Sequence, residues 1–401
     1  MTTTDPSTSR QPLFSTVAIV ASCAAFVVIG ALQALYGPAI PALRQEFGIS
    51  PAVAGFSLSG HFIGALLGVL VYHMLRGRLN NRALLAVSYL FMAVGAFLFA
   101  LSPSWALALI GTFFAGLGYG GIDYGLNQLF AIGFGSRSTA MLNLLNGGFG
   151  VGAVVGPVLI GGLGAENYPW IFAAVGIMCA LILLTLRGVA AWEPSLPGEG
   201  AARNGGARVL PIIASFIGIY VFHVAIETGV GGWEPTHLQA VGYGAAIAAS
   251  ATSAYWLAMT IGRFVVIPLS LRWSASAILN VCCAGMAVFL LLATIPVLAP
   301  YAYFGVGLMI APIFPTCLPW LSRAVPSMSG ASAYVIAASM LGGVAFPPLL
   351  GGVIDTTGVK FMPVVLFVLA VLCVVLGVWL SKNAPDHGST TNTSGSVKAK
   401  H

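Results

Sequence analysis

One acidic residue, Asp123, lies deep inside a long apolar stretch of the chain. The segment from Ala106 to Phe134 holds no other charged residue, and it exceeds the roughly 20 residues that cross a bilayer as a helix. An ionised carboxylate at bilayer depth costs at least about 2.5–3.5 kcal/mol. We therefore expect Asp123 to face a bundle interior or a water-filled cavity and to be functional. The simpler alternative is a structural bond to a neighbouring helix.

The residues around Asp123 favour a polar site on one helix face. Asn127 follows four positions later, so on a helix its side chain shares the face of Asp123. Four glycines between positions 116 and 121 leave little bulk just before the acid. Such small residues either bring helices close together or leave room for a ligand.

A second acid within an apolar stretch is Glu227, with His223 four residues before it. Burial in apolar surroundings favours the neutral form of a carboxyl group, so a buried acid can take up and release a proton. Asp123 and Glu227 are therefore the candidate proton-coupling residues. Two other roles stay open for Glu227, namely a ligand for a polar solute and a structural partner of His223.

The composition indicates a polytopic helical membrane protein. Of the 401 residues, 58% are hydrophobic and only 6% are charged, whereas soluble proteins carry about 25% charged residues. The apolar runs are continuous rather than alternating, which argues against a β-barrel. The six cysteines lie within apolar runs without the spacing of metal ligands. We expect no metal and no cofactor, and the net charge of +6 comes from basic gaps between apolar runs rather than from a nucleic-acid surface.

Twelve apolar segments divide the chain into two halves. The segments are 13–36, 52–73, 83–101, 105–134, 139–164, 168–189, 209–232, 243–270, 275–296, 299–322, 328–354 and 359–381. We expect a disordered tail at 1–12, a six-helix half at 13–189, a cytoplasmic linker at 190–208, a second six-helix half at 209–381 and a disordered tail at 382–401. A faint internal repeat, with glycines and prolines recurring at half-chain distance, supports this division.

The basic residues predict the orientation. If both termini are cytoplasmic, only Arg44 and Lys360 of the 16 Lys and Arg residues fall on the outer side, as the positive-inside rule requires. Four acids are then expected at or near the outer face, namely Glu46, Glu166, Glu234 and Asp355.

Six plus six helices, a long central loop and a basic loop near residue 77 resemble the major facilitator superfamily. Its signature in that loop is kept in part, as Gly68 and Arg76-Gly77-Arg78, but the expected acid is absent. A better-kept counterpart is Gly262-Arg263-Phe264. The resemblance implies a gating role for Arg263, Arg76 and Arg78, and the alternative is that these arginines only anchor the topology.

Within this superfamily, three stretches are similar to the fucose and glucose/mannose:proton symporter branch. They read GLGYGGIDYGLNQ, MLNLLNGGFGVGAVVGP and YVFHVAIETGVGGW. The fucose symporter carries an additional acid in its first helix, whereas the corresponding stretch here, from Gln33 to Pro41, has none. A scheme with acids on the first and fourth helices therefore does not carry over, and Glu227 supplies the second acid, as in the glucose-like members.

A sugar site needs amides and carboxylates for hydroxyl groups, since each unpaired hydroxyl costs roughly 1–3 kcal/mol. It also needs aromatic rings for the apolar faces of the sugar. The candidate substrate-binding residues are Gln33, Tyr36, Asp123, Asn127, Asn143, Asn146, Glu227 and Trp256. Trp233 and Trp320 are either further sugar platforms or interfacial anchors.

The predicted function is secondary active transport of a small polar organic solute, preferentially a monosaccharide, with protons by alternating access. Sodium is an alternative coupling ion, because carboxylate and amide oxygens also suit a hard cation. We expect a monomer in the plasma membrane that binds a small solute and no nucleic acid. Two alternatives stay open: a proton-coupled exporter of drugs or other organic compounds, and a non-transporting sensor of the same fold. The sequence shows no nucleophile–base pair or phosphate loop that would favour an enzyme.

Overall fold

The computed structural model of the protein describes residues 13–134, 137–192, 209–325 and 331–384. The predicted tail 1–12, most of the tail 382–401 and most of the linker 190–208 lie outside these described residues. Within the described part of the chain, twelve segments are helical, long and apolar enough to cross a membrane. The predicted fold class, an all-α membrane protein with twelve such helices, is confirmed.

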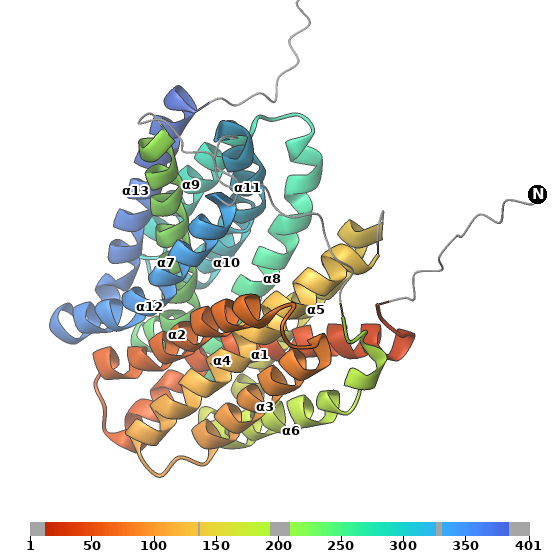
Figure 1. Cartoon of the computed structure of the whole chain (residues 1–401). Helices are drawn as coiled ribbons and strands as arrows, with labels where there is room; N and C mark the ends of the chain where they lie inside the picture. The colour runs from red at the N-terminus through yellow and green to blue at the C-terminus, as the bar shows by residue number, and fades with distance from the viewer. Residues whose placement is uncertain (1–12, 135–136, 193–208, 326–330, 385–401) are drawn as a thin grey trace, which may run out of the picture.

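The helices form two groups, each of six spans. In Figure 1 the first group lies in the lower part of the picture and the second group in the upper part. The first group comprises α1 (Thr16–Phe47), α2 (Pro51–Leu75), α3 (Asn81–Ala100), α4 (Trp105–Gly133), α5 (Ser138–Leu163) and α6 (Tyr168–Leu183), with the short 3-10 turns η2 (Ala165–Asn167) and η3 (Leu186–Gly188). The second comprises α7 (Val209–Ala240), α8 (Ala245–Ser270), α9 (Ala275–Leu292), α10 (Ala299–Ile310), α11 (Ile313–Ala324), α12 (Ala331–Thr357), η4 (Val359–Phe361) and α13 (Met362–Asn383).

Three helices differ from the predicted segments at their prolines. α1 continues past the expected end at residue 36, through Pro38 and Pro41, and α7 continues past residue 232 through Pro235. Proline is tolerated inside membrane helices when neighbouring helices satisfy the freed backbone groups. The tenth segment is instead divided into α10 and α11, because Pro312 stands at the start of α11 and has no N–H to continue the first helix.

The glycines before Asp123 serve helix packing rather than ligand space. A side chain at Gly116 or Gly120 would collide with the backbone of α2, and one at Gly118 would collide with α3 at Met92. These glycines therefore hold α4 tightly between α2 and α3. The contact fixes the position of Asp123, which follows on the same helix.

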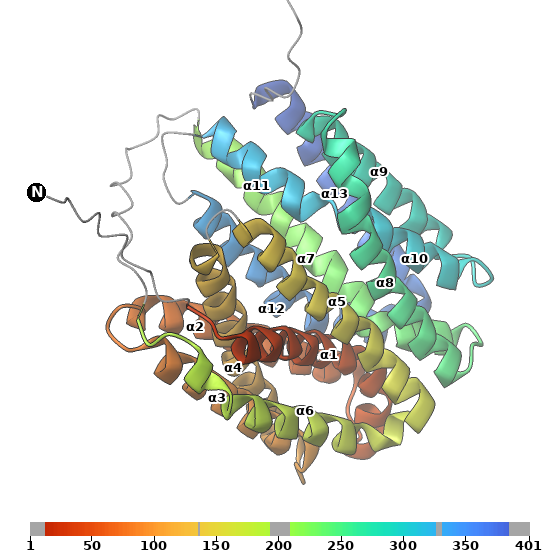
Figure 2. The same ribbon diagram turned by 90° about the vertical axis from the view of Figure 1, so that its right-hand side faces the viewer.

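The halves meet through α1, α2 and α5 on one side and α7, α8 and α12 on the other. Figure 2 shows α5 beside α8 at this junction. We call the end that carries Arg76, Arg78, Arg137, Arg272 and Arg323 the basic end, and the end with the loops after α1, α7 and α12 the opposite end.

The halves are closed against each other at the opposite end. The backbone of Gly37 on α1 lies so close to that of Gly231 on α7 that a Cβ atom would not fit between them. Nearby, the Ser59 hydroxyl of α2 donates a hydrogen bond of 2.6 Å to the Val344 carbonyl of α12. Close backbone approach at glycines is how membrane helices pack without large apolar side chains.

Asp355 at the end of α12 reinforces this closure. Its Oδ2 atom accepts hydrogen bonds from the Ser50 hydroxyl at 2.9 Å and from the Ala52 N–H at 3.0 Å. Both donors belong to the start of α2, where the free N–H groups and the helix dipole favour a negative charge. An acid of one half thus caps a helix of the other.

Candidate functional site

A cavity of about 700 Å³ lies between the halves toward the basic end. The polar and aromatic residues that line it include Asn143 and Asn146 on α5, Arg263 and Ser270 on α8, Trp273 after α8, and Phe314 and Arg323 on α11. The opposite end is closed and this cavity reaches the basic end, so the structure is accessible from one end only. Asn143 and Asn146 line the same cavity, as their spacing of three residues predicted.

One polar cluster joins the halves beside this cavity. Gln33 on α1 donates from Nε2 to Glu227 Oε1 on α7 over a long distance of 3.5 Å. The Tyr119 hydroxyl on α4 donates to Gln33 Oε1 at 2.6 Å. His223 Nε2 lies 3.5 Å from the other oxygen of Glu227, so the pairing of Glu227 with His223 does occur. Glu227 nonetheless also contacts the first half through Gln33, which a purely local structural pair would not do.

A second polar cluster contains Asp123. Asn127 donates from Nδ2 to Asp123 Oδ1 at 3.0 Å, and Asn146 donates to Asn127 Oδ1 at 3.1 Å. This chain of hydrogen bonds runs from α4 to α5 and ends at the cavity, because Asn146 lines it. Asp123 makes no ion pair within the described residues, and its carboxyl group is held by an amide.

Arg263 connects the two clusters electrostatically. Its guanidinium group on α8 interacts with the carboxyl groups of both Asp123 and Glu227, and its side chain is exposed in the cavity. A single cation therefore faces two acids that come from different halves. The result is a polar site in which protonation of either acid changes the balance of charge around Arg263.

Trp256 on α8 belongs to the junction of the halves. Its ring faces Phe149 of α5 in an edge-to-face contact with centroids 6.5 Å apart. Its indole N–H is buried and has no hydrogen-bond partner among the described residues. A buried donor of this kind is available to a solute hydroxyl.

Tyr36 does not join the site. Its ring is fully buried and packs against Phe99 and Phe172 inside the first half, with its hydroxyl 3.4 Å from His61 Nδ1. The prediction that the Tyr36 ring packs against a sugar is therefore wrong for this structure. Tyr36 follows Gln33 by three residues, but its ring packs into the core of the first half, whereas Gln33 contacts Tyr119 of α4 and Glu227 of α7.

Two tryptophans are also placed differently from expectation. Trp233 and Trp320 are fully buried, and Trp233 donates its indole N–H to the Pro347 carbonyl at 3.3 Å. The ring of Trp320 packs edge-to-face on Phe216, with centroids 5.3 Å apart. An interfacial anchor needs an exposed amphipathic ring, so the anchoring interpretation is wrong for both.

The three arginines expected at a gate lie in different places in this conformation. Arg76 donates to Gln128 Oε1 at 3.4 Å, a contact within the first half. Arg78 is exposed in the loop between α2 and α3. Arg263 lies with the two acids rather than at the rim. A gating role for these three residues stays a prediction that concerns the other conformation.

The acids expected at the outer face separate into two kinds. Glu166 and Asp355 are exposed, as expected, near the opposite end. Glu234, in contrast, is completely buried, although it lies in the last two turns of α7, toward the same end. α7 extends to Ala240, which places residue 234 inside the helical bundle rather than in a loop.

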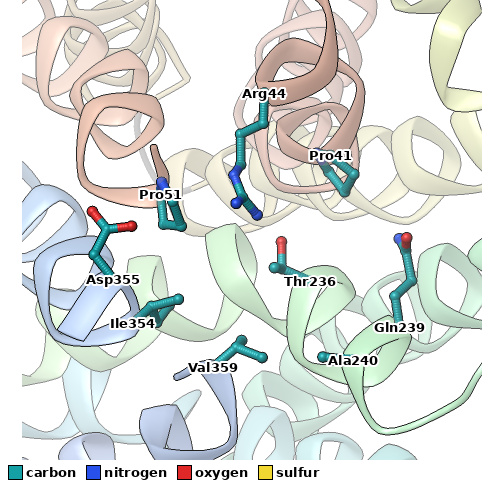
Figure 3. Close-up of a pocket in the computed structure, with 9 residues that line it drawn as sticks. All are labelled: Pro41, Arg44, Pro51, Thr236, Gln239, Ala240, Ile354, Asp355 and Val359. Carbon is teal, nitrogen blue, oxygen red and sulfur yellow. The ribbon is translucent and has the colours of Figure 1, made fainter. Parts of the chain in front are cut away.

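A further cavity of about 550 Å³ lies at the opposite end. Figure 3 shows Arg44 reaching from α1 toward Thr236 on α7, with Gln239 beside them and Asp355 across the cavity. It is a vestibule outside the closed contact between the halves. Within residues 13–134, 137–192, 209–325 and 331–384, no three His, Cys, Asp or Glu side chains gather as metal ligands would.

The sequence analysis did not identify Tyr119 and Tyr255 as residues of the site. Tyr119 precedes Asp123 by four residues, so the helical period could have placed it on the same face. Tyr255 on α8 donates to the Glu227 carbonyl at 3.4 Å, and no spacing within its own helix indicates that contact. Of the predicted site residues, Gln33, Asp123, Asn127, Asn143, Asn146, Glu227, Trp256 and Arg263 gather around the cavity and the junction.

Comparison with known proteins gives one family and several relatives. The model of the Major Facilitator Superfamily matches residues 22–327. An uncharacterized MFS-type transporter of Yersinia pestis is 26% identical over 242 residues, which cover 60% of this chain and 62% of that protein. The glucose/mannose transporter GlcP of Bacillus subtilis is 23% identical over 380 residues, or 90% of this chain and 94% of that one. The crystal structure of a D-xylose-proton symporter superposes with a TM-score of 0.73 at 14% identity, over 93% of this chain and 99% of that chain.

Proposed function

We propose that this chain, which belongs to the Major Facilitator Superfamily, moves a monosaccharide together with protons by alternating access. The chain is a multi-pass integral protein of the plasma membrane, and its family and fold are those of transporters rather than enzymes. The solute and the coupling ion are the parts that we propose.

The observation that carries the proposal is the set of amides and acids that the two halves share. Gln33 contacts Glu227 across the junction, and the chain of Asp123, Asn127 and Asn146 leads to the cavity. Amides and carboxylates offer several hydrogen bonds from one side chain, which suits a solute with many hydroxyl groups. The name of the Bacillus subtilis relative, a glucose/mannose transporter, supports the same solute class.

The coupling ion is proposed from the acids. Asp123 has an amide partner rather than a cation in direct contact, and Glu227 has a histidine and an amide. A carboxyl group so placed can exist with or without a proton as the cavity changes from wet to dry. Both acids interact with Arg263, so a proton on one acid leaves the other as the remaining counterion of Arg263. The D-xylose-proton symporter of similar fold couples a sugar to protons, as its name states.

In the proposed cycle the basic end is cytoplasmic and the structure is the inward-facing state. The halves part at Gly37 and Gly231 to admit solute from the outer side and then close again around the polar clusters. Rocking of two halves about a site near the midplane is the general route of such transporters. This cycle requires no covalent bond between the protein and the solute.

One observation favours the competing reading as an exporter of organic compounds. The cavity toward the basic end has aromatic and apolar walls as well as polar ones, including Trp273, Phe314 and Ile278. An amphipathic cation would bind there with Asp123 and Glu227 as counterions. Arg263 in the same cavity opposes a cation, which is why we place the sugar first.

Counterflow of labelled sugars in proteoliposomes tests the proposal. We expect saturable exchange of glucose, mannose or a 6-deoxyhexose by the wild-type protein. The Asn146→Leu variant removes the amide group at the cavity. The lost hydrogen bonds to the solute are expected to reduce the binding free energy by about 1–3 kcal/mol, which weakens the affinity for sugar roughly 5- to 150-fold.

The matched control is Asn280→Leu, since Asn280 bonds Ser381 between α9 and α13, away from the cavity. It should exchange sugar as the wild type does. If wild-type protein exchanges no sugar but extrudes a labelled organic cation, the exporter reading replaces the sugar proposal.

A further inference from the structure

Glu234 on α7 is an acid that the site described above does not use. Its side chain has no exposed surface, and neither carboxyl oxygen has a hydrogen-bond partner among the described residues. It follows Glu227 by seven residues, or two helical turns, and so shares that side of α7. Each buried polar group without a partner calls for an explanation.

The groups around Glu234 offer it no countercharge. The Thr252 hydroxyl of α8 acts on the carboxyl group, but that hydroxyl already points toward the Ala248 carbonyl at 3.3 Å. The hydroxyl groups of Tyr255 on α8 and Tyr303 on α10 also interact electrostatically with the carboxyl group of Glu234. His237, one turn further along α7, lies 2.9 Å from the Tyr303 hydroxyl, to which it is paired.

An ionised carboxylate in such a place would be very costly. Burying a charge without a partner costs far more than burying a neutral group, so the acid holds a proton instead. The Thr252 hydroxyl gives the ionised form little support, because it donates its hydrogen to the Ala248 carbonyl at 3.3 Å. The closed surroundings of Glu234 therefore suit a protonated carboxyl group better than a carboxylate.

Two cavities lie close to the part of α7 that carries Glu234. Gln239 lines the vestibule of about 550 Å³. It also lines a small cavity of about 30 Å³ together with Pro235, Gly161 and Ala249. About 10–15 Å³ suffices for one water molecule. Parting of α1 and α5 from α7 and α8 would open this small cavity and hydrate the acid next to Pro235.

We propose that Glu234 is a proton-binding site of the protein that must be loaded before the opposite end can close. When that end is open, the hydrated carboxylate takes a proton from hydronium in the vestibule, which forms one O–H bond and leaves water. Closing then removes the water around a neutral group rather than around a charge. Only the link from this site to solute transport rests on the proposed function; the site itself does not.

The test needs no solute. A Ser270→Cys reporter, which lines the cavity at the basic end, is labelled with a water-soluble maleimide reagent across a pH series corrected for thiolate fraction. With Glu234 present, lower pH should favour closure of the opposite end and faster labelling, by up to about tenfold per pH unit for one proton. Glu234→Gln mimics the loaded acid and should label fast at every pH, whereas Glu166→Gln, which changes an exposed acid near that end, should behave as the parent.

Infrared spectroscopy of the protein in liposomes provides the second readout. The neutral-carboxyl band of the wild type should contain a component from Glu234 that is lost in Glu234→Gln and shifted in Glu234→Asp, whatever Asp123 and Glu227 contribute to the band. The same spectrum in all three proteins, or the same pH dependence of labelling with and without Glu234, overturns the proposal. If Glu234→Gln does not fold, the Glu234→Asp spectrum decides alone. Failure of sugar exchange in the wild type would leave both readouts untouched, so it would count against the proposed solute only.

Discussion

Replacing Asp123 by asparagine is expected to abolish proton-driven accumulation of solute while leaving solute exchange intact. The Asn side chain keeps the shape of Asp123 and can still bond Asn127, whose amide now holds the carboxyl group. It cannot take up a proton. One proton moved with each solute across about 100 mV supplies about 2.3 kcal/mol, which corresponds to about fiftyfold accumulation. The variant should reach an inside-to-outside ratio near one.

The measurement compares accumulation and counterflow in the same proteoliposomes, since counterflow requires no net proton movement. Glu166→Gln serves as a matched control, because it removes an exposed acid instead of one in the bundle. If Asp123→Asn accumulates solute like the wild type, coupling belongs to Glu227. If counterflow is lost as well, Asp123 is a structural or solute-binding residue rather than the coupling site.

The Gly37→Ala variant is expected to hold the protein open at the opposite end. A Cβ atom on Gly37 would collide with the Gly231 carbonyl across the junction of the halves, so the closed state is destabilised and the open state is not. Overpacking of this kind costs about 1–3 kcal/mol, or a shift of roughly 5- to 150-fold between the two states. Labelling of Ser270→Cys at the basic end should slow by that factor, and transport should fall with it.

Gly162→Ala near the end of α5 is the control for this variant. A Cβ atom at Gly162 has no neighbour within 4 Å in the described structure, and alanine favours the helix. Labelling and transport should therefore equal those of the parent protein. Normal transport by Gly37→Ala would show that the close contact of α1 with α7 is not a state of the cycle.

The twelve-helix architecture could be predicted from the sequence, because the length of the apolar segments and the positions of the charged residues determine it. Lipid requires each span to be a continuous helix of adequate length, so the segments and their division into halves follow from composition. The ends of α1 and α7 were misplaced because Pro38 and Pro235 look like helix breakers on a linear chain. Tertiary packing of these helices overrides that local signal, whereas at Pro312 the local signal prevails.

The site could be predicted where its residues share one helix. Asp123 and Asn127 are four residues apart and do bond each other, and Asn143 and Asn146 line one cavity. Contacts between helices have no such period. The pairing of Tyr119 with Gln33 joins residues far apart in sequence, and the burial of Tyr36 depends on how α1 is rotated against the first half. Those facts come from packing alone.

The measurement that bears most directly on proton-coupled sugar transport is solute-driven proton movement. Wild-type proteoliposomes hold an internal pH indicator, no ion gradient is imposed, and the sugar found to exchange is added outside. Protons should enter with the sugar and acidify the interior, and Asp123→Asn should show sugar entry without acidification. Sugar entry by the wild type with no change in internal pH would contradict proton coupling, and dependence of that entry on sodium would assign the coupling to sodium instead.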